Sequence, residues 1–298
     1  MRLLVTGLSG FVGSHCSQQF AAVDLLHEGR LAELRDRDEV RAAVAHARPE
    51  AVIHLAAQSY VPASFDDPAL TREVNVGGTL NLLLGLQAAG FQGRMLYVGS
   101  ADAYGLVAET HLPVTEEHAL NPLSPYAESK AEAEALCREW SAKGKFEIVI
   151  ARPFNHIGPR QGTRFAVASF ARQIAAFRAG RGPGRMVAGD LDTTRDFTDV
   201  RDVVRAYSAL LESGRNGEAY NVCSGVERSL REVVGAMMDA AGVTMEIETE
   251  PSLLRKTEQR RMWGSFEKLR RDTGWQTSID FRQTLADTLQ YWEQEDRP

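Results

Sequence analysis

The chain has 298 residues, 44% of them hydrophobic, which is enough to bury one large core or two unequal ones. Its formal charge of −6 and its 34 scattered basic residues argue against nucleic acid as the main partner. Three cysteines without metal-ligand spacing, a first strand at residue 2 and the lack of an apolar run of transmembrane length predict a cytoplasmic protein with reduced thiols, no metal site and no membrane contact.

The first predicted element is a short apolar strand that leads directly into glycines at positions 7, 10 and 13. A strand, a tight glycine turn and a helix N-terminus together form the fingerprint that binds a dinucleotide. Gly7 would let the chain turn, Gly10 would let the backbone approach a pyrophosphate, and Gly13 would let the new helix pack on the sheet. The N–H groups at the helix start would bind the phosphates. The same glycines are also compatible with a turn that binds no ligand.

The ribose of such a cofactor is normally bound by an acidic residue about 20 positions beyond the glycines. Here Asp24 and Glu28 come too early, and Glu33 lies in a charged segment with helical character. The first strand–helix–strand unit is therefore predicted to be abbreviated. None of the three acids is a convincing ribose ligand, so the choice between NADH and NADPH stays open.

Apolar runs and helical patterns alternate through the first half of the chain. We predict strands buried on both faces over 51–57, 94–100 and 146–153, and helices over 69–89 and 126–143. Strands that alternate with helices form a parallel sheet covered by helices on both faces. The sequence therefore predicts an α/β fold with a Rossmann-type, doubly wound parallel sheet.

The second half of the chain contains shorter elements, separated by loops rich in Gly, Pro and Arg. They include a strand near 219–223 and helices near 229–241 and 281–295. We predict a cofactor-binding domain over 1–153 and a smaller C-terminal substrate-binding lobe over 154–298, with some later segments returning to the first domain.

Tyr126 and Lys130 stand four residues apart on a predicted helix, so they face the same side, one turn apart. An ammonium stabilises a phenolate, so Lys130 is expected to lower the pKa of Tyr126 toward the range that suits an acid–base catalyst. Ser100 ends a strand at the sheet edge where ligands bind, and its hydroxyl would hydrogen-bond a substrate oxygen. The trio fits proton transfer coupled to hydride transfer from a nicotinamide. A packed tyrosine beside a surface lysine is the alternative.

Several segments resemble, in order and spacing, the extended branch of the short-chain dehydrogenase/reductase family: TGLSGFVG, HLAAQS, NVGGT, VGSADAYG, PYAESK and ARPFN. The resemblance covers nearly the whole chain. It implies that Ser100, Tyr126 and Lys130 form a catalytic triad, that Lys130 also holds the nicotinamide ribose, and that Asn75 supports the site rather than being a helix-surface amide. It also implies a homodimer through a four-helix interface built from the helices over 69–89 and 126–143.

The resemblance further assigns residues to the two ligands. The cofactor NADPH or NADH is expected to contact Gly7, Gly10, Phe11, Val12, Gly13, Glu33, Leu34, Leu55, Ala56, Ala57, Tyr126, Lys130 and Pro153. A nucleotide sugar is expected to contact Ser59, Ser100, Asp102, Asn155, Arg195, Arg255 and Glu258. Guanidinium groups suit its pyrophosphate because they bind phosphate in a bidentate manner, although each arginine is also compatible with a solvated surface charge.

Two later segments, 151–161 and 188–202, resemble family members that act on GDP-linked deoxyhexoses. They imply reduction of the C4 keto group of GDP-4-keto-6-deoxy-D-mannose, which gives GDP-D-rhamnose. The alternatives are a GDP-mannose 4,6-dehydratase, a nucleotide-sugar 4-epimerase and, from another class, a redox-sensing regulator that binds NADP without catalysis. Relatives of the regulator type lack the tyrosine–lysine pair, which is present here.

Two departures favour the reductase over the dehydratase. The dehydratases carry a glutamate two residues before the tyrosine of the strand-end YG motif, where this chain has Asp102. Aspartate is one methylene shorter, and a misplacement of about 1 Å can cost roughly 10²-fold in rate. The dehydratases also tend to have an acidic residue where Ile157 follows Asn155 and His156. Asp102 is alternatively a turn residue that accepts hydrogen bonds from nearby N–H groups.

Overall fold

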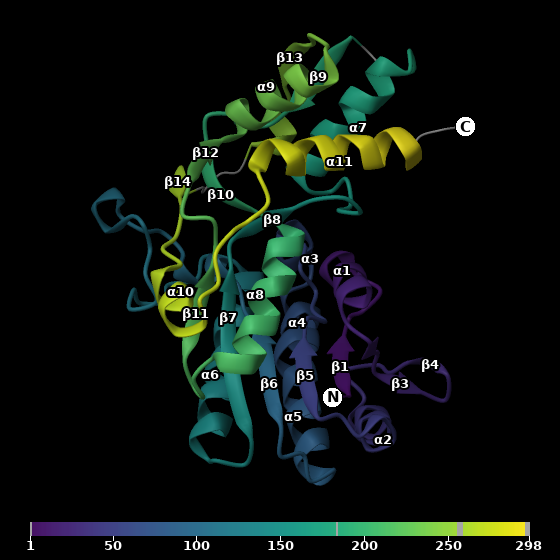
Figure 1. The fold of residues 1–298 in the computed structure, drawn as a ribbon, viewed down its shortest axis with the longest axis vertical. Coiled ribbons are helices and arrows are strands. Elements are labelled where there is room, and N and C mark those ends of the chain that lie inside the picture. The colour runs from purple at the N-terminus through teal and green to yellow at the C-terminus, as the bar shows by residue number, and fades with distance from the viewer. Residues whose placement is uncertain (1, 183, 255–258, 296–298) are drawn as a thin grey trace.

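Six parallel strands form the central sheet of the structure, a computed structural model that describes residues 2–182, 184–254 and 259–295 (Figure 1). Most residues of these strands are buried on both faces, as their continuous apolar runs predict. In spatial order the strands are β2 (Ala22–Val23), β1 (Leu3–Thr6), β5 (Ala51–His54), β6 (Arg94–Val98), β7 (Glu147–Pro153) and β11 (Ala219–Val222). The strand order reverses beside β1, so the carboxyl edge there is where a ligand binds in a doubly wound sheet.

Helices cover both faces of this sheet. Alternate residues of a strand point to opposite faces, and β1 accordingly places Leu4 in one core cluster and Leu3 and Val5 in the other. The Leu4 side carries α2 (Arg37–Ala47), α5 (Gly78–Ala88) and α6 (Pro125–Ala142), and the opposite side carries α1 (Phe11–Gln19), α8 (Val200–Ser213) and α10 (Glu267–Thr273). The predicted Rossmann-type, doubly wound fold is confirmed.

The first strand–helix–strand unit is short. Helix α1 has nine residues and β2 has two, after which the chain forms a small antiparallel hairpin of β3 (Leu26–His27) and β4 (Arg30–Leu31). Because α1 is short, β2 arrives early in the sequence. The prediction of an abbreviated first unit is confirmed.

The helical stretch expected over 69–89 contains a π turn. The chain forms α3 (Val61–Asp66) and α4 (Pro68–Arg72), then a π-helical turn over Glu73–Gly77, and then α5. The helical stretch predicted over 69–89 is confirmed, and the π turn within it adds a residue to the local repeat. Such turns often occur at functional sites, and this one contains Asn75. Helix α6 likewise confirms the helix predicted over 126–143.

The second lobe contains shorter elements and a separate core. Its strands are β8 (Asn155–Ile157), β9 (Arg185–Ala188), β10 (Thr194–Asp199), β12 (Glu227–Ser229), β13 (Glu246–Thr249) and β14 (Arg261–Met262). Its helices α7 (Ala166–Arg178), α9 (Leu230–Ala241) and α11 (Phe281–Glu295) share one apolar cluster, so the lobe has a core of its own. The helices predicted near 229–241 and 281–295 are confirmed.

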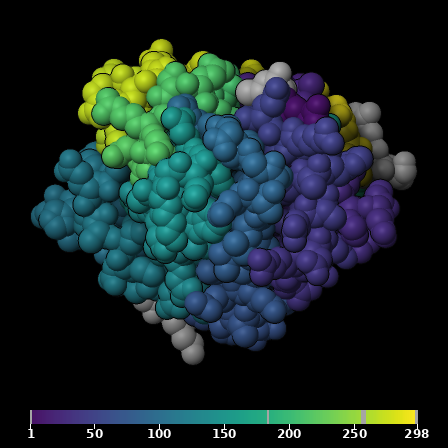
Figure 2. Space-filling model, turned by 90° about the horizontal axis from the view of Figure 1, so that it is seen from below, coloured from purple at the N-terminus to yellow at the C-terminus, as the bar shows by residue number. Residues whose placement is uncertain are grey.

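Parts of the second half pack against the central sheet rather than in the second lobe. Strand β11 pairs with β7 in parallel, and α8 and α10 pack on the sheet. Figure 2 views the molecule from below and shows green and yellow segments, from late in the sequence, against one corner of a face that is otherwise mostly purple to teal. The division of the chain at residue 153 stays a prediction. Across the described ranges, no helix has the length and apolarity to cross a membrane.

Candidate active site

The glycine turn after β1 has the geometry of a phosphate-binding loop. Gly7 has a φ of +78°, and a Cβ there would lie 3.1 Å from the backbone of Ala56. A Cβ on Gly13 would lie 2.2 Å from the carbonyl oxygen of Gly7, so helix α1 packs directly against the turn and leaves no room for a side chain there. Gly10 precedes the helix, and in the part of the chain that the structure describes no side chain caps it. The N–H groups at this helix start therefore suit a dinucleotide pyrophosphate.

Asp24 directly follows β2, the position of the ribose-binding acid in a dinucleotide-binding unit. Its carboxylate accepts hydrogen bonds from the N–H groups of Gly7, Leu8 and Leu25, and burial raises its pKa. Because α1 is short and brings β2 forward, Asp24 stands directly after β2 despite its early place in the sequence, while the residue that binds the ribose stays a prediction. Glu33 lies on the surface, where its carboxylate forms an ion pair with Arg35.

A buried chain of hydrogen bonds connects the glycine turn to the π turn. The Thr6 hydroxyl lies 2.7 Å from Nδ1 of His54, and Nε2 of His54 lies 3.0 Å from the Thr79 hydroxyl, which donates to the carbonyl of Asn75. The Ala56 N–H donates to the Thr6 hydroxyl. These directions place the imidazole proton on Nε2. Burial, then the charge of Lys130, lowers the pKa of His54 to about 3, so the ring is neutral.

Asn75 is a buried residue and not a surface amide, since only 2% of it is exposed. Its oxygen accepts the N–H of Gln58 at 2.8 Å, and its amide donates to the carbonyl of Gln58 at 3.1 Å and to the hydroxyl of Ser129 at 2.8 Å. Ser129 donates to the carbonyl of Tyr126. Asn75 thus connects the loop after β5 to the first turn of α6, which carries Tyr126.

The predicted trio lies at the carboxyl edge of β6. Ser100 follows the strand, while Tyr126 and Lys130 occupy the first turns of α6, which begins at Pro125 with Ser124 as its cap. Lys130 Nζ donates to the carbonyl of Val98 at 2.7 Å. All three members of the trio are at least 90% buried. The strand end and the helix start therefore place a hydroxyl, a phenol and an amine in one region.

The pKa of Tyr126 differs from what the sequence predicts. Burial, followed by the charge of Asp102, raises the pKa of Tyr126, and a hydrogen bond with Ser100 opposes the rise. The structure differs from the prediction that Lys130 lowers the pKa of Tyr126, because Tyr126 is only 8% exposed and desolvation dominates. Burial also lowers the pKa of Lys130 to about 8. The phenol is thus protonated at neutral pH.

The other candidate cofactor residues lie on several elements. Phe11 of α1 stacks on His156 of the second lobe with ring centroids 5.9 Å apart. Leu34 packs against Gly78, whose Cβ, if present, would lie 3.0 Å from it. Val12 lies in α1, Leu55, Ala56 and Ala57 follow β5, and Pro153 ends β7. These elements end at or beside the carboxyl edge of the sheet.

The candidate substrate residues come from several elements. Asp102 lies exposed on a 3₁₀ turn over Ala101–Tyr104, and Ser59 is exposed in the loop after β5. Asn155 lies on β8 opposite Phe197 of β10, the strand that also carries Arg195. Arg195 donates to the carbonyl of Thr194 at 2.7 Å. The remaining candidates, Arg255 and Glu258, lie outside the described residues.

The sequence reasoning missed a pocket of about 480 Å³ beside the glycine turn. Gly10 and Phe11 line one side of it, and Arg160 and Tyr291 of the second lobe line the other. Arg160 is a non-glycine residue with a φ of +72°. A left-handed conformation outside glycine is a signal that only the structure gives. Across the described ranges, no cluster of three or more His, Cys, Asp or Glu has the arrangement of a metal site.

Comparison with known proteins identifies the family. The family model described as GDP-mannose 4,6 dehydratase matches residues 25–288. A GDP-6-deoxy-D-mannose reductase of Pseudomonas aeruginosa is 46% identical over 305 residues, which cover 98% of this chain and 97% of the relative. A UDP-glucose 4-epimerase of Mycolicibacterium smegmatis is 30% identical over 98% of each chain.

The solved structures agree with this result. One described as RMD from Pseudomonas aeruginosa complexed with NADPH is 45% identical, has a TM-score of 0.93 and matches over 99% of each chain. A dTDP-glucose 4,6-dehydratase from Streptomyces venezuelae with bound NAD is 28% identical, with a TM-score of 0.86. The chain therefore belongs to the GDP-mannose 4,6-dehydratase family, within the extended short-chain dehydrogenases/reductases.

Proposed function

We propose that this protein reduces the C4 keto group of GDP-4-keto-6-deoxy-D-mannose to give GDP-D-rhamnose, with NADPH or NADH as the reductant. The observation that carries the proposal is the meeting of Ser100, Tyr126 and Lys130 at the carboxyl edge of β6, in a fold whose glycine turn suits a dinucleotide. The 46% identity to a GDP-6-deoxy-D-mannose reductase supports the sugar. The NADPH of the similar solved structure supports the cofactor.

Tyr126 is the proton donor in this proposal. A bound, reduced nicotinamide supplies the hydride that adds to C4 of the sugar. The keto oxygen becomes an alkoxide, and the Tyr126 phenol transfers its proton to that oxygen and becomes a phenolate. Ser100 hydrogen-bonds the same oxygen and stabilises its developing charge. The raised pKa of Tyr126 keeps the phenol protonated until the alkoxide forms.

Lys130 acts after the proton has left. Lys130 lies on the same helix face as Tyr126, and in this proposal its ammonium offsets part of the cost that burial imposes on the phenolate. The carbonyl of Val98 and the ring of Tyr97, 5.3 Å from Nζ, hold the amine in a buried position. Because burial lowers the pKa of Lys130 to about 8, the charged form still predominates at neutral pH.

The 4,6-dehydratase is the second candidate, because the matching family model has that description and Asp102 places a carboxylate near the trio. A dehydratase must also remove the C5 proton and expel the C6 hydroxyl, for which its relatives use a glutamate. Asp102 is shorter by one methylene, and Ala101 beside it provides no second acid. These features favour the reductase.

The test is a comparison of substrates with the purified chain. With GDP-4-keto-6-deoxy-D-mannose and NADPH, we expect oxidation of NADPH and a single reduced nucleotide sugar with the configuration of D-rhamnose at C4. GDP-mannose alone, with NADP⁺, is expected to be unchanged. Formation of a 4-keto-6-deoxy product from GDP-mannose would instead assign the dehydratase. Conversion of UDP-glucose to UDP-galactose would assign an epimerase, and the lack of turnover of every sugar would favour a regulator.

We also infer a homodimer and a cytoplasmic location, both of which remain predictions. Helices α5 and α6, expected to form a four-helix interface with their copies, lie on the same face of the sheet. Sedimentation of the purified chain would give its mass in solution. A monomer at micromolar concentration would contradict the inferred interface.

A further inference from the structure

Arg152 lies next to the last residue of β7 with only 3% of its surface exposed, and this burial needs an explanation. Its guanidinium holds both oxygens of Glu134, with Nε 2.9 Å from Oε2 and Nη2 2.6 Å from Oε1. Glu134 is 2% exposed. Removing two charges from water is costly, and a buried ion pair often stabilises a fold no better than an apolar pair of similar volume. A buried pair of this kind suits a role in fixing geometry.

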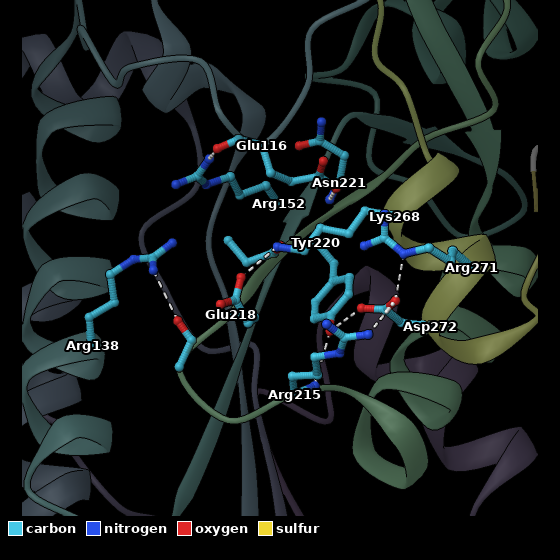
Figure 3. A network of polar contacts seen from close by, with 12 residues as sticks. Glu116, Arg138, Arg152, Arg215, Glu218, Tyr220, Asn221, Lys268, Arg271 and Asp272 are labelled. Atoms are coloured by element: carbon cyan, nitrogen blue, oxygen red, sulfur yellow. Dashed lines mark hydrogen bonds and ion pairs between the residues drawn. The ribbon is translucent and has the colours of Figure 1, made fainter.

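The hydrogen bonds of this pair continue through Tyr104 to β11, the edge strand that pairs with β7. Arg152 Nη1 donates to the Tyr104 hydroxyl at 2.9 Å, and that hydroxyl donates to Oδ1 of Asn221 at 2.7 Å. Asn221 in turn donates to the carbonyl of Val114 at 3.0 Å. The Arg152 guanidinium also lies over the Tyr104 ring, 4.9 Å from its centre. Figure 3 shows Arg152 and Asn221 side by side, with Glu116 next to them.

Two residues of this network belong to the elements that carry the predicted trio. Glu134 lies four residues after Lys130 on α6, so it shares the helix face that carries Lys130 and Tyr126. Tyr104 ends the 3₁₀ turn over Ala101–Tyr104, whose cap is Ser100. The network therefore connects the helix that carries the phenol to the turn that carries the serine.

We propose that Arg152 is a positioning residue, which, through Glu134 and Tyr104, sets the distance between the Ser100 turn and the Tyr126 helix. We call the network of Arg152, Glu134 and Tyr104 the clamp. This inference rests on the function proposed above, because it assigns the clamp to that reaction. A fully satisfied buried network has a single arrangement, so it holds the two elements at a fixed separation. Loosening it displaces Ser100 relative to Tyr126 while the glycine turn keeps its shape.

The test uses Tyr104→Phe, which removes only the oxygen that joins Arg152 to Asn221 and leaves the Arg152–Glu134 pair in place. We expect kcat to fall about 10- to 100-fold, because a misplacement of reacting groups by about 1 Å can cost roughly 10²-fold. The KM values for NADPH and for the sugar are expected to stay within about twofold of wild type. A purely structural role would not separate kcat from KM.

Tyr220→Phe is the matched control. Tyr220 is the residue next to Asn221 on β11, is also fully buried, and also loses one hydroxyl, which donates to Asp272 at 3.0 Å and accepts the N–H of Arg215 (Figure 3). We expect this variant to lose thermal stability without the fall in kcat. Equal kcat values for the two variants would overturn the proposal.

Amide hydrogen exchange provides a readout that does not depend on catalysis. Tyr104→Phe is expected to speed exchange over 100–104, and Tyr220→Phe is not. Faster exchange in a protein whose wild type reduces no keto sugar would leave the clamp standing and reject the proposed function. Unchanged exchange over 100–104 would reject the clamp. Should Tyr104→Phe fail to fold, Glu134→Asp, which keeps the charge but shortens the side chain, takes its place with the same two expectations.

Discussion

Lys130 Nζ donates a hydrogen bond to the carbonyl oxygen of Val98, 2.7 Å away, and so fastens helix α6 to the end of strand β6. Two residues beyond Val98, the chain reaches Ser100. The amine of the predicted pair therefore also acts as a structural contact between the two elements that carry the trio. Its burial is a consequence, because an amine held against a strand carbonyl has lost most of its water.

Replacement of Tyr126 by phenylalanine tests the proton donor. The variant keeps the buried ring but has no proton to transfer, so we expect kcat to fall by about 10²- to 10⁴-fold. NADPH binding, measured by titration of its fluorescence, is expected to remain within severalfold of wild type. Unchanged turnover of the keto sugar would remove Tyr126 from the mechanism.

Activity is expected to fall as the pH rises past about 8. The folded-state pKa of Lys130 is lowered to about 8 from its usual 10.5, so the ammonium is present below pH 8 and lost above it. The measurement is kcat/KM for NADPH between pH 6 and 10, which reports groups of the free enzyme. Lys130→Arg keeps its charge and is expected to show no inflection near 8. A wild-type profile that is flat from pH 7 to 9 would contradict this assignment.

Gly13→Ala is expected to damage the cofactor site, because its Cβ would lie 2.2 Å from the carbonyl oxygen of Gly7. Overpacking of this kind costs about 1–3 kcal/mol, and the turn that suits the pyrophosphate must shift. We expect a lower free energy of unfolding and NADPH binding weaker by about tenfold or more. Gly235→Ala in α9 is the control, since among the described residues no atom outside its own stretch of helix lies within 4 Å of the added Cβ. That change should stabilise the helix by about 0.5–1 kcal/mol and leave NADPH binding unchanged.

The buried His54 is expected to lower the free energy of unfolding in acid. Its folded-state pKa is about 3 and its ordinary value is 6.5, so between these values the unfolded chain binds a proton that the folded chain does not. The free energy of unfolding therefore falls by about 1.4 kcal/mol for each pH unit below 6.5 on account of this group. Denaturant unfolding at several pH values would measure the slope. His54→Gln should have a shallower slope than wild type, and parallel slopes would contradict the prediction.

The fold was accessible from the sequence because its signals are local. The buried strands read as apolar runs, and the strand–helix alternation specified a parallel sheet. The π turn at Asn75 was not accessible, since one extra residue in a helical repeat leaves no mark in an apolar stripe. The position of Asp24 directly after β2 was not accessible for a related reason: a spacing rule assumes an ordinary first helix, and α1 is short.

The site was accessible in part. Residue types and spacing were enough to predict that Ser100, Tyr126 and Lys130 lie together. Their ionisation was not accessible, because the direction of the Tyr126 pKa depends on how completely the fold encloses the phenol. Arg152 was also missed, since within ARPFN it reads as part of a strand, and its partners on α6 and in the 3₁₀ turn are distant in sequence.

The pairing of β11 with β7 has a consequence for any attempt to divide the molecule. A fragment that stops at residue 153 would lose the edge strand β11. Strand β7, which is apolar along most of its length, would then become an unpaired edge strand. Unpaired N–H and C=O groups on such an edge recruit other chains. Excision of the first 153 residues is therefore expected to yield insoluble material, so cofactor binding should be studied only in the intact polypeptide.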